Sequence, residues 1–181
     1  MCNSIKGGKS YERVDGERRL RNPSITVRPT TRNDTEWIAS VLTKWWGSTS
    51  IVSRGRLIDA TALPGFLAAW KNTTVGLVTY AITGRSCEIV TLNSLEPGKG
   101  IGACLVNEVK RVAEEARCTR LWVITTNDNT LALRFYQRHG FHLVAVHRNA
   151  LERSRRLKKE IPRLGQDGIP LRDEIELEMT L

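Results

Sequence analysis

The amino-acid sequence predicts an α/β fold with a mixed, mostly antiparallel central sheet of about six to seven strands flanked by helices. Three short apolar runs separated by turn residues occupy 65–95, and this spacing is typical of an antiparallel meander. An amphipathic pattern of helical period follows at 101–116. A strictly alternating strand closes the chain at 174–181. Strands and helices in this order indicate one mixed sheet.

A first strand and a first helix are predicted before residue 47. SITVRPT at 24–30 alternates apolar and polar residues, as a strand on a sheet face does. Asn33 can cap the helix that follows, and Glu36 lies three positions later, as in a capping box. The apolar face of this helix consists of Trp37, Ile38, Val41, Leu42 and Trp45. Residues 47–62 are expected to form an irregular loop with a short element.

The middle and end of the chain supply the remaining elements. After the meander come a helix at 101–116, a buried-type strand at 121–126, a short helix at 129–139 and a strand at 141–146. Gly140 stands where a left-handed helix cap belongs. Residues 148–160 are charged and are expected to form an exposed helix. The final strand alternates apolar residues with Glu174, Glu176 and Glu178.

Size and charge bound the class of protein. The chain has 181 residues, which suits one domain. Residues 1–22 lack apolar periodicity, and we interpret them as a flexible basic tail before a single domain at 23–181. The net charge is +9, but the excess is concentrated in that tail and at 153–159. We therefore expect no nucleic-acid partner, and no recognised DNA-binding signature supports one.

The cysteines and the apolar runs point to a reduced compartment. Cys2, Cys87, Cys104 and Cys118 lack the short spacings of zinc or redox motifs, so no metal is expected. Residues 1–20 are polar and charged, unlike a secretory signal. No apolar run approaches the length of a membrane span, so no membrane partner is expected. We expect a cytoplasmic protein, with monomer and homodimer both open.

The strongest local signal is PGKGIGA at 97–103, between an apolar strand and an amphipathic helix. Glycines let the backbone approach a ligand closely. The start of the helix offers free N–H groups and the positive end of the helix dipole to a phosphate. The pattern predicts an anion site that suits a pyrophosphate, and a tight turn without a ligand is the alternative.

Two known phosphate loops fit this turn poorly. A P-loop needs Gly-Lys-Ser/Thr after its spacer, and Gly98-Lys99-Gly100 does not supply it. A dinucleotide fingerprint matches Gly98, Gly100 and Ala103, but it belongs in the first turn of a parallel strand–helix–strand unit. Here three antiparallel-type strands come first, and the next strand, LWVITT, carries no acidic residue.

A third pattern covers more of the chain. PGKGIG resembles the Q/R-x-x-G-x-G/A acetyl-coenzyme A loop of the GNAT superfamily. NDNTLALRFYQRHGF at 127–141 is similar to that superfamily's next signature: an Asn, a small residue, an aromatic pair and a closing Gly-Phe. The order of elements is also similar over 24–147 and the final strand. Pro97 departs from the family's Gln or Arg and has no N–H to donate, and the charge of Lys99 can compensate.

The resemblance implies a GNAT-like N-acetyltransferase with acetyl-coenzyme A as co-substrate. It would act by direct attack of a primary amine in a ternary complex. The cofactor-binding residues that it implies are Leu92, Asn93, Gly98, Lys99, Gly100, Ile101, Gly102 and Asn129. Leu92 and Asn93 are expected near the thioester, where a backbone N–H stabilises the oxyanion. Asn129 also has a plain structural role as a helix N-cap, and the two roles are compatible.

Two residues are candidates for catalysis. Tyr136 matches the family tyrosine that protonates the departing thiolate, and a core tyrosine beside Phe135 is the alternative. The phenol must be held close to the sulfur, since its ordinary pKa is above that of a thiol. LWVITT offers no carboxylate, so the base that some family members carry there has no counterpart. Glu88 is the candidate base, and a solvated strand residue is the alternative.

The acceptor amine is not identified by the sequence. Trp46 falls off the apolar stripe of the first helix and is a candidate wall of the acceptor site, whereas Trp45 is expected in the core. The segment 148–172 is longer than a hairpin turn needs, and we expect it to cover the acceptor site. A non-catalytic sensor of acetyl-coenzyme A is the alternative function, because no base is fixed by the sequence.

Overall fold

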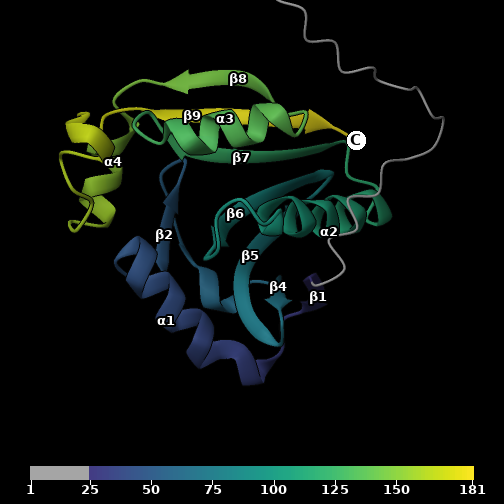
Figure 1. Cartoon of the computed structure of the whole chain (residues 1–181). Helices are drawn as coiled ribbons and strands as arrows, with labels where there is room; N and C mark the ends of the chain where they lie inside the picture. Colours follow the sequence, from purple (N-terminus) through teal and green to yellow (C-terminus); the bar gives the residue numbers. More distant parts are fainter. Residues whose placement is uncertain (1–24) are drawn as a thin grey trace, which may run out of the picture.

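A seven-stranded sheet in the order β1-β4-β5-β6-β7-β9-β8 forms the frame of the protein, with a separate β2-β3 hairpin (Figure 1). The structure is a computed structural model that describes residues 25–181, so the predicted tail at 1–22 lies outside the described residues. The strands are β1 (Ile25–Pro29), β2 (Ser50–Ser53), β3 (Arg56–Asp59), β4 (Gly65–Trp70), β5 (Thr73–Thr83), β6 (Ser86–Ser94), β7 (Arg120–Thr126), β8 (His142–His147) and β9 (Glu174–Thr180). Only β6 and β7 pair in parallel within the large sheet, so the predicted mixed, mostly antiparallel sheet is confirmed.

Helices flank both faces of this sheet. They are α1 (Thr35–Trp46), α2 (Ile101–Glu115), α3 (Thr130–Arg138) and α4 (Ala150–Leu157). Val78 of β5 packs in one core cluster with the apolar stripe of α2, whereas its neighbour Leu77 packs in a second cluster with α1. Successive strand residues point to opposite faces, so α1 and α2 cover opposite faces of β5. Within residues 25–181, no helix is both long and apolar enough to cross a bilayer.

The strands β6 and β7 separate towards their C-terminal ends. Their pairing joins Ser86–Ile89 to Arg120–Val123 and stops there, although both strands continue. On the other edge of β6, Thr91 pairs with Thr79 and Ile89 with Tyr80, so Val90 is an extra residue, a β-bulge. A bulge bends its strand, so it turns β6 away from β7 where their pairing ends. The opening that results is visible between β6 and β7 in Figure 1.

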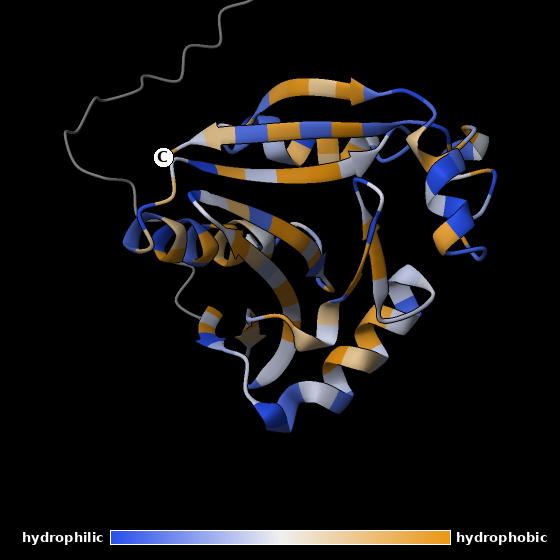
Figure 2. Cartoon of the chain, turned by 180° about the vertical axis from the view of Figure 1, so that it is seen from behind, coloured by the Kyte–Doolittle hydropathy of each residue, from blue (hydrophilic) through white to orange (hydrophobic). Residues whose placement is uncertain are grey.

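The final strand carries the predicted alternation, seen as orange and blue bands along β9 in Figure 2. Leu177 is fully buried, as expected of its apolar face. The glutamates are not all on a solvated face, however, because Glu174 and Glu176 are only 2% and 4% exposed. The beginning of β9 therefore brings carboxylates into the interior of the fold.

Residues 47–62 are more regular than the sequence indicated. Instead of an irregular loop they form the β2-β3 hairpin, paired from Ser50 with Asp59 to Ser53 with Arg56. Arg54 and Gly55 link the strands with φ of 48° and 71°. Two consecutive residues with positive φ are typical of the tight hairpin turn whose twist matches that of the strands. The expectation of an irregular loop was wrong because Arg54, at a position that favours Asn or Asp, hides the turn.

The start of α1 is organised around Asp34 rather than Asn33. The Asp34 carboxylate accepts hydrogen bonds from the Thr31 N–H at 2.7 Å and the Thr31 hydroxyl at 2.8 Å. It also accepts two from the Arg28 guanidinium, at 2.6 and 2.8 Å. These contacts hold the pKa of Asp34 well below its usual range, chiefly through Arg28. The capping box predicted from Asn33 and Glu36 was therefore wrong by two residues.

The segment before β9 packs against the α1–β2 region. Lys158, at the end of α4, is buried, and its ammonium donates to the carbonyls of Trp46 at 2.8 Å and Ser50 at 2.9 Å. Leu151 and Ser154 of α4 are buried as well. The expected helix is present, but one of its faces is covered rather than exposed. Burial lowers the pKa of Lys158, and the carboxylate of Glu160 opposes this shift in part.

Candidate active site

A cavity of about 740 Å³ lies at the C-terminal end of β6, beside the first turns of α2 and α3. It brings together residues that are far apart in the sequence. The predicted site residues that line it are Leu92, Asn93, Gly98, Gly100, Ile101, Gly102, Asn129 and Tyr136. Lys99 and Glu88 are not among its lining residues. The cavity therefore joins the glycine-rich turn to the Asn–Tyr motif of α3.

The turn from β6 to α2 exposes its backbone to this cavity. Gly98 and Gly100 have φ of 76° and 81°, in the left-handed region that favours glycine. A Cβ built at either residue would meet no atom within 4 Å. Gly100 is the N-cap of α2, and its carbonyl accepts from the N–H of Cys104, so the N–H groups at 101–103 have no partner within the helix. The first turn of α2 carries no acidic residue, which leaves its positive dipole end available to an anion.

Lys99 is directed to an aromatic ring instead of the cavity. Its ammonium lies 4.8 Å from the centroid of the Trp70 ring, where the negative face of the indole attracts a cation. Pro97, the departure from the family loop, does line the cavity. Compensation for Pro97 by the charge of Lys99 stays a prediction.

Tyr136 lies in an aromatic cluster and faces the cavity. Its ring contacts Phe135 and Phe141 edge-on, each with ring centroids 5.2 Å apart. Its hydroxyl makes no hydrogen bond within residues 25–181. Burial raises the pKa of the Tyr136 phenol well above its usual range, so the group stays protonated at physiological pH. Packing fixes the ring and leaves one proton donor directed to no protein acceptor.

Asn129 has the structural role that its position predicts. Its side-chain oxygen accepts a hydrogen bond from the N–H of Ala132 at 3.0 Å, which caps α3. The same residue lines the 740 Å³ cavity. The amide nitrogen of Asn129 makes no hydrogen bond within the described part of the chain, so it is available as a donor.

A second, narrower cavity of about 80 Å³ occupies the opening between β6 and β7. Asn129 lines both cavities, so they are neighbours. Glu88 of β6 and Glu174 of β9, the strand on the far side of β7, both line the narrow cavity. Most of its other lining side chains are aliphatic, such as Val90, Ile124 and Leu151. We call it the inner cavity.

Glu88 is buried and fully engaged. It is 3% exposed; one carboxylate oxygen accepts from the Ser53 hydroxyl at 2.5 Å and the other from the Arg56 guanidinium at 2.8 Å. Burial raises the pKa of Glu88, and these two donors oppose the shift in part. The alternative of a solvated strand residue is therefore wrong for Glu88. Its role as the base stays a prediction.

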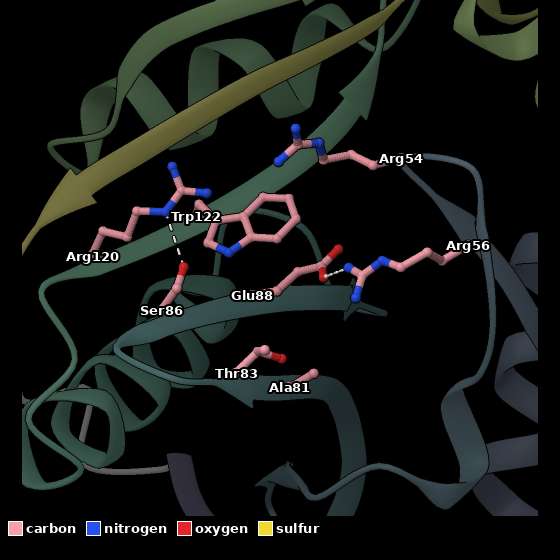
Figure 3. Close-up of a pocket in the computed structure, with 8 residues that line it drawn as sticks. All are labelled: Arg54, Arg56, Ala81, Thr83, Ser86, Glu88, Arg120 and Trp122. Atoms are coloured by element: carbon pink, nitrogen blue, oxygen red, sulfur yellow. Dashed lines mark hydrogen bonds and ion pairs between the residues drawn. The ribbon is translucent and has the colours of Figure 1, made fainter.

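A third cavity of about 350 Å³ lies on the outer side of Glu88 (Figure 3). Arg54 and Arg56 of the β2-β3 hairpin approach from one side, and Arg120 and Trp122 of β7 from the other. The Arg54 and Arg120 guanidinium carbons lie 5.7 and 5.2 Å from the Trp122 ring centroid. Because Glu88 lines this outer cavity and the inner one, the two adjoin at its carboxylate.

The two tryptophans at the end of α1 divide between the cavities. Trp45, expected in the core, is 55% exposed and lines the 740 Å³ cavity. Helical spacing alone misplaced it, because Trp45 lies in the last turn of α1, where it lines a cavity instead of packing in the core. Trp46 lines the inner cavity and donates from its indole N–H to the side-chain oxygen of Asn93 at 3.2 Å. Trp46 of the inner cavity thus orients Asn93, which lines the 740 Å³ cavity.

Glu174 is the site residue that the sequence analysis missed. Its alternation with apolar residues in β9 resembles an ordinary strand with one solvated face. Nothing local in the sequence distinguishes it from Glu178, which is partly exposed and paired with Arg120. Glu174 is buried by tertiary contacts, among them a hydrogen bond from Ser154 of α4 and strand neighbours in β7 and β8. Among the described residues, no group of three or more His, Cys, Asp or Glu side chains is arranged to hold a metal ion.

Sequence comparison identifies the class of protein. The model of the Acetyltransferase (GNAT) family matches residues 34–141, which is more than half of the chain. The protein belongs to this family, as its loop and its Asn–Tyr motif indicated. A relative, the uncharacterised protein YdhI of Bacillus subtilis, is 42% identical over 133 residues, covering 73% of this chain and 83% of YdhI.

Solved structures of low sequence identity share the fold. An IAA acetyltransferase from Bacillus cereus superposes with a TM-score of 0.69 at 22% identity, covering 87% of this chain and 100% of that one. A GNAT family acetyltransferase from Elizabethkingia anophelis with acetyl-CoA bound gives a TM-score of 0.63 at 21% identity, covering 87% and 99%. The protein thus has the overall fold of these acetyltransferases.

Proposed function

We propose that this protein transfers the acetyl group of acetyl-coenzyme A to a primary amine through a ternary complex. One observation carries the proposal: a single cavity joins the α2 N-terminus, the end of β6 and the Asn129–Tyr136 face of α3. This cavity offers backbone N–H groups for a pyrophosphate, apolar walls for a pantetheine arm and a phenol for a sulfur. The residues present therefore fit acetyl-coenzyme A, whose thioester supplies the activated acetyl group.

Binding falls to the backbone of Gly98, Gly100 and the first turn of α2, with Asn129 as a side-chain donor to the pantetheine arm. Beyond Ile89, β6 has no strand partner on its β7 side, so alternate N–H and C=O groups on that edge are available. A backbone N–H at Leu92 or Asn93 would donate to the developing oxyanion of the thioester carbonyl. The donor is held in place by pairing of β6 with β5, which costs no reorganisation during the reaction.

The transfer needs three proton movements. The acceptor ammonium loses a proton to Glu88, directly or through water, and the neutral amine attacks the carbonyl carbon to form the C–N bond. As the C–S bond breaks, Tyr136 donates its proton to the departing sulfur. The proton released by the new amide nitrogen returns to Tyr136. The buried, protonated state of Tyr136 and the buried carboxylate of Glu88 support these assignments.

Thiol release tests the function. The protein is incubated with acetyl-coenzyme A and a panel of peptide N-termini, polyamines, amino acids and aminoglycosides, and free coenzyme A is measured. We expect release that depends on at least one amine, together with an acetylated product of the matching mass. Tight binding of acetyl-coenzyme A, with no coenzyme A released in the presence of any amine, would instead support the non-catalytic sensor.

The free thiols of Cys87, Cys104 and Cys118 support the cytoplasmic location that we expect.

A further inference from the structure

One carboxylate oxygen in the inner cavity has no partner. Among residues 25–181, Glu174 Oε2 is the only fully buried side-chain nitrogen or oxygen that makes no hydrogen bond. The other oxygen of Glu174 accepts from the Ser154 hydroxyl at 3.2 Å. Leaving a buried polar atom without a partner destabilises a fold, and more so when the atom is charged. Such an atom calls for an explanation, and a catalytic or binding role is one of the few that account for it.

No cation of the described protein neutralises Glu174. Lys158, the buried ammonium at the end of the same helix as Ser154, donates to the carbonyls of Trp46 and Ser50 instead. Arg54 and Arg120 form ion pairs with Glu176, two residues further along β9. Glu174 thus lines the inner cavity, and its carboxylate forms no ion pair within residues 25–181.

The inner cavity suits a small cation. Its second carboxylate, Glu88, has both oxygens occupied by Ser53 and Arg56. Glu174 is therefore the carboxylate of the inner cavity without a cation, and among aliphatic walls it favours a positive group over a neutral or negative one. The volume of about 80 Å³ admits the end of a slender side chain and excludes a bulky substrate.

The position of this cavity links it to acetyl transfer. It shares Asn129 with the 740 Å³ cavity and Glu88 with the outer cavity of Figure 3. A chain that enters past Arg56 and Glu88 would therefore bring its end towards the thioester. Trp46 adds a second connection, because it lines the inner cavity and hydrogen-bonds Asn93 of the larger one.

We infer that Glu174 binds the acceptor, accepting a hydrogen bond from its ammonium group at Oε2. The substrate class is a primary amine on an unbranched methylene arm, since a branch next to nitrogen would meet the aliphatic walls. This inference rests on the proposed function, because the acceptor is the substrate of the proposed acetyl transfer. As a cation site, however, the inner cavity is measurable without any transfer.

Calorimetry with n-pentylamine tests the site in the full-length protein, with and without saturating coenzyme A. The matched probes are 2-aminopentane, which is branched next to nitrogen, and 1-pentanol, which is neutral. We expect pentylamine to bind about 10- to 100-fold more tightly than either, as a charged hydrogen bond to a buried carboxylate provides. Equal affinity for the amine and the alcohol in the unaltered protein would overturn the inference, whatever any variant does.

Two glutamate variants of β9 then locate the interaction. Glu174→Gln should remove the preference for amine over alcohol. Glu178→Gln, four residues along the same strand and bonded to Arg120 at the surface, should keep it. A preference that survives in Glu174→Gln would assign the cation site elsewhere and overturn the role of Glu174.

The same variants distinguish this inference from the proposed function. If amines are acetylated but Glu174→Gln leaves their KM unchanged, the function stands and the inference fails. If no amine is acetylated but pentylamine binds in a Glu174-dependent way, the inference stands as a cation site and the transfer reaction fails.

Discussion

Tyr136 is held by its neighbours rather than by its hydroxyl, and this makes its chemistry separable from its packing. The ring rests against Phe135 and Phe141, and the hydroxyl has no acceptor among the described residues. Tyr136→Phe removes one oxygen and keeps the ring contacts. If the phenol is the general acid, kcat should fall by about 10²- to 10⁴-fold in the thiol-release assay.

The affinity for acetyl-coenzyme A serves as the control for this variant. Binding is expected to depend on the backbone of the α2 turn, so calorimetry should give a Kd within about twofold of the parent. An undiminished kcat would return Tyr136 to a purely structural role in the aromatic cluster. A large loss of affinity with normal kcat would make its hydroxyl a binding group instead.

Residues in local motifs were predictable from the sequence, and those that depend on tertiary packing were not. Asn129 and Tyr136 belong to one short motif, and the structure brings both to one cavity with the glycine-rich turn. Glu174 gave no signal, because its burial results from tertiary contacts, among them one with α4, a helix that precedes it by some twenty residues. Trp45 was misplaced for the same reason: helical period predicts which face is apolar but not how far along a helix the sheet extends.

At the scale of elements, the turn into α2 combines a backbone requirement with a ligand requirement. Gly100 has φ of 81°, and a Cβ there would enter open space in the cavity. Gly100→Val should therefore give a folded protein that loses acetyl-coenzyme A affinity by at least about tenfold, because the side chain projects where the phosphates are expected. Calorimetry on the purified variant measures this loss.

Gly84 provides the matched control for that variant. It also has positive φ, at 59°, and also meets nothing within 4 Å, but it lies in the β5–β6 turn away from the cavity. Gly84→Val carries a similar backbone strain of about 1–2 kcal/mol without a ligand to displace. Equal affinities for the two variants would mean that the turn at Gly100 has no contact with the cofactor.

The free energy of unfolding should depend on pH through Asp34, which holds the start of α1 in place. Asp34→Asn should lower the free energy of unfolding by about 1–2 kcal/mol at pH 7, a modest value because Arg28 is half exposed and solvent screens the pair. The folded-state pKa of Asp34 lies below its unfolded value near 3.9. Its stabilising contribution is therefore present above pH 4 and is lost as pH falls through the folded-state pKa.

Urea denaturation at pH 7, 5 and 3 tests this dependence. The difference between the parent and Asp34→Asn should be constant from pH 7 to 5 and should shrink at pH 3. Asp167→Asn is the control, since Asp167 is exposed and forms no ion pair within the described residues. A difference for Asp34→Asn that persists unchanged at pH 3 would show that the amide loses packing or geometry rather than charge.

The order of the elements was predictable because each long element has a clear period. The stripe of α2, the meander and the final strand agree with the structure to within a few residues. The β2-β3 hairpin escaped prediction because four-residue strands such as Ser50–Ser53 show too little alternation to stand out. The cap at Asp34 escaped because its partner, Arg28, belongs to the preceding strand, β1.

At the scale of the molecule, acetyl-coenzyme A should stabilise the fold, because the residues proposed to bind it come from three separate elements. At a concentration one hundred times Kd, a ligand specific for the folded state adds about 2.7 kcal/mol. For a chain of this size, the melting temperature should rise by about 5–10 °C. Differential scanning calorimetry with acetyl-coenzyme A, and with NAD as the control ligand, measures the shift. A rise with NAD alone would contradict the assignment of the cavity.

The short parallel seam between β6 and β7 has a consequence for hydrogen exchange. In the part of the chain that the structure describes, the strand pairing between the β1-β4-β5-β6 half of the sheet and the β7-β9-β8 half consists of four residue pairs, Ser86–Ile89 with Arg120–Val123; the halves are the lower and upper groups in Figure 1. A seam this short can open as a local cooperative unit without global unfolding. Amides at 121–123 should then exchange faster than those in the middle of β5. The 740 Å³ cavity is lined by residues from both halves, so a ligand that fills it would hold the two halves together. Slower hydrogen exchange of the amides at 121–123 would then show that the cavity is occupied.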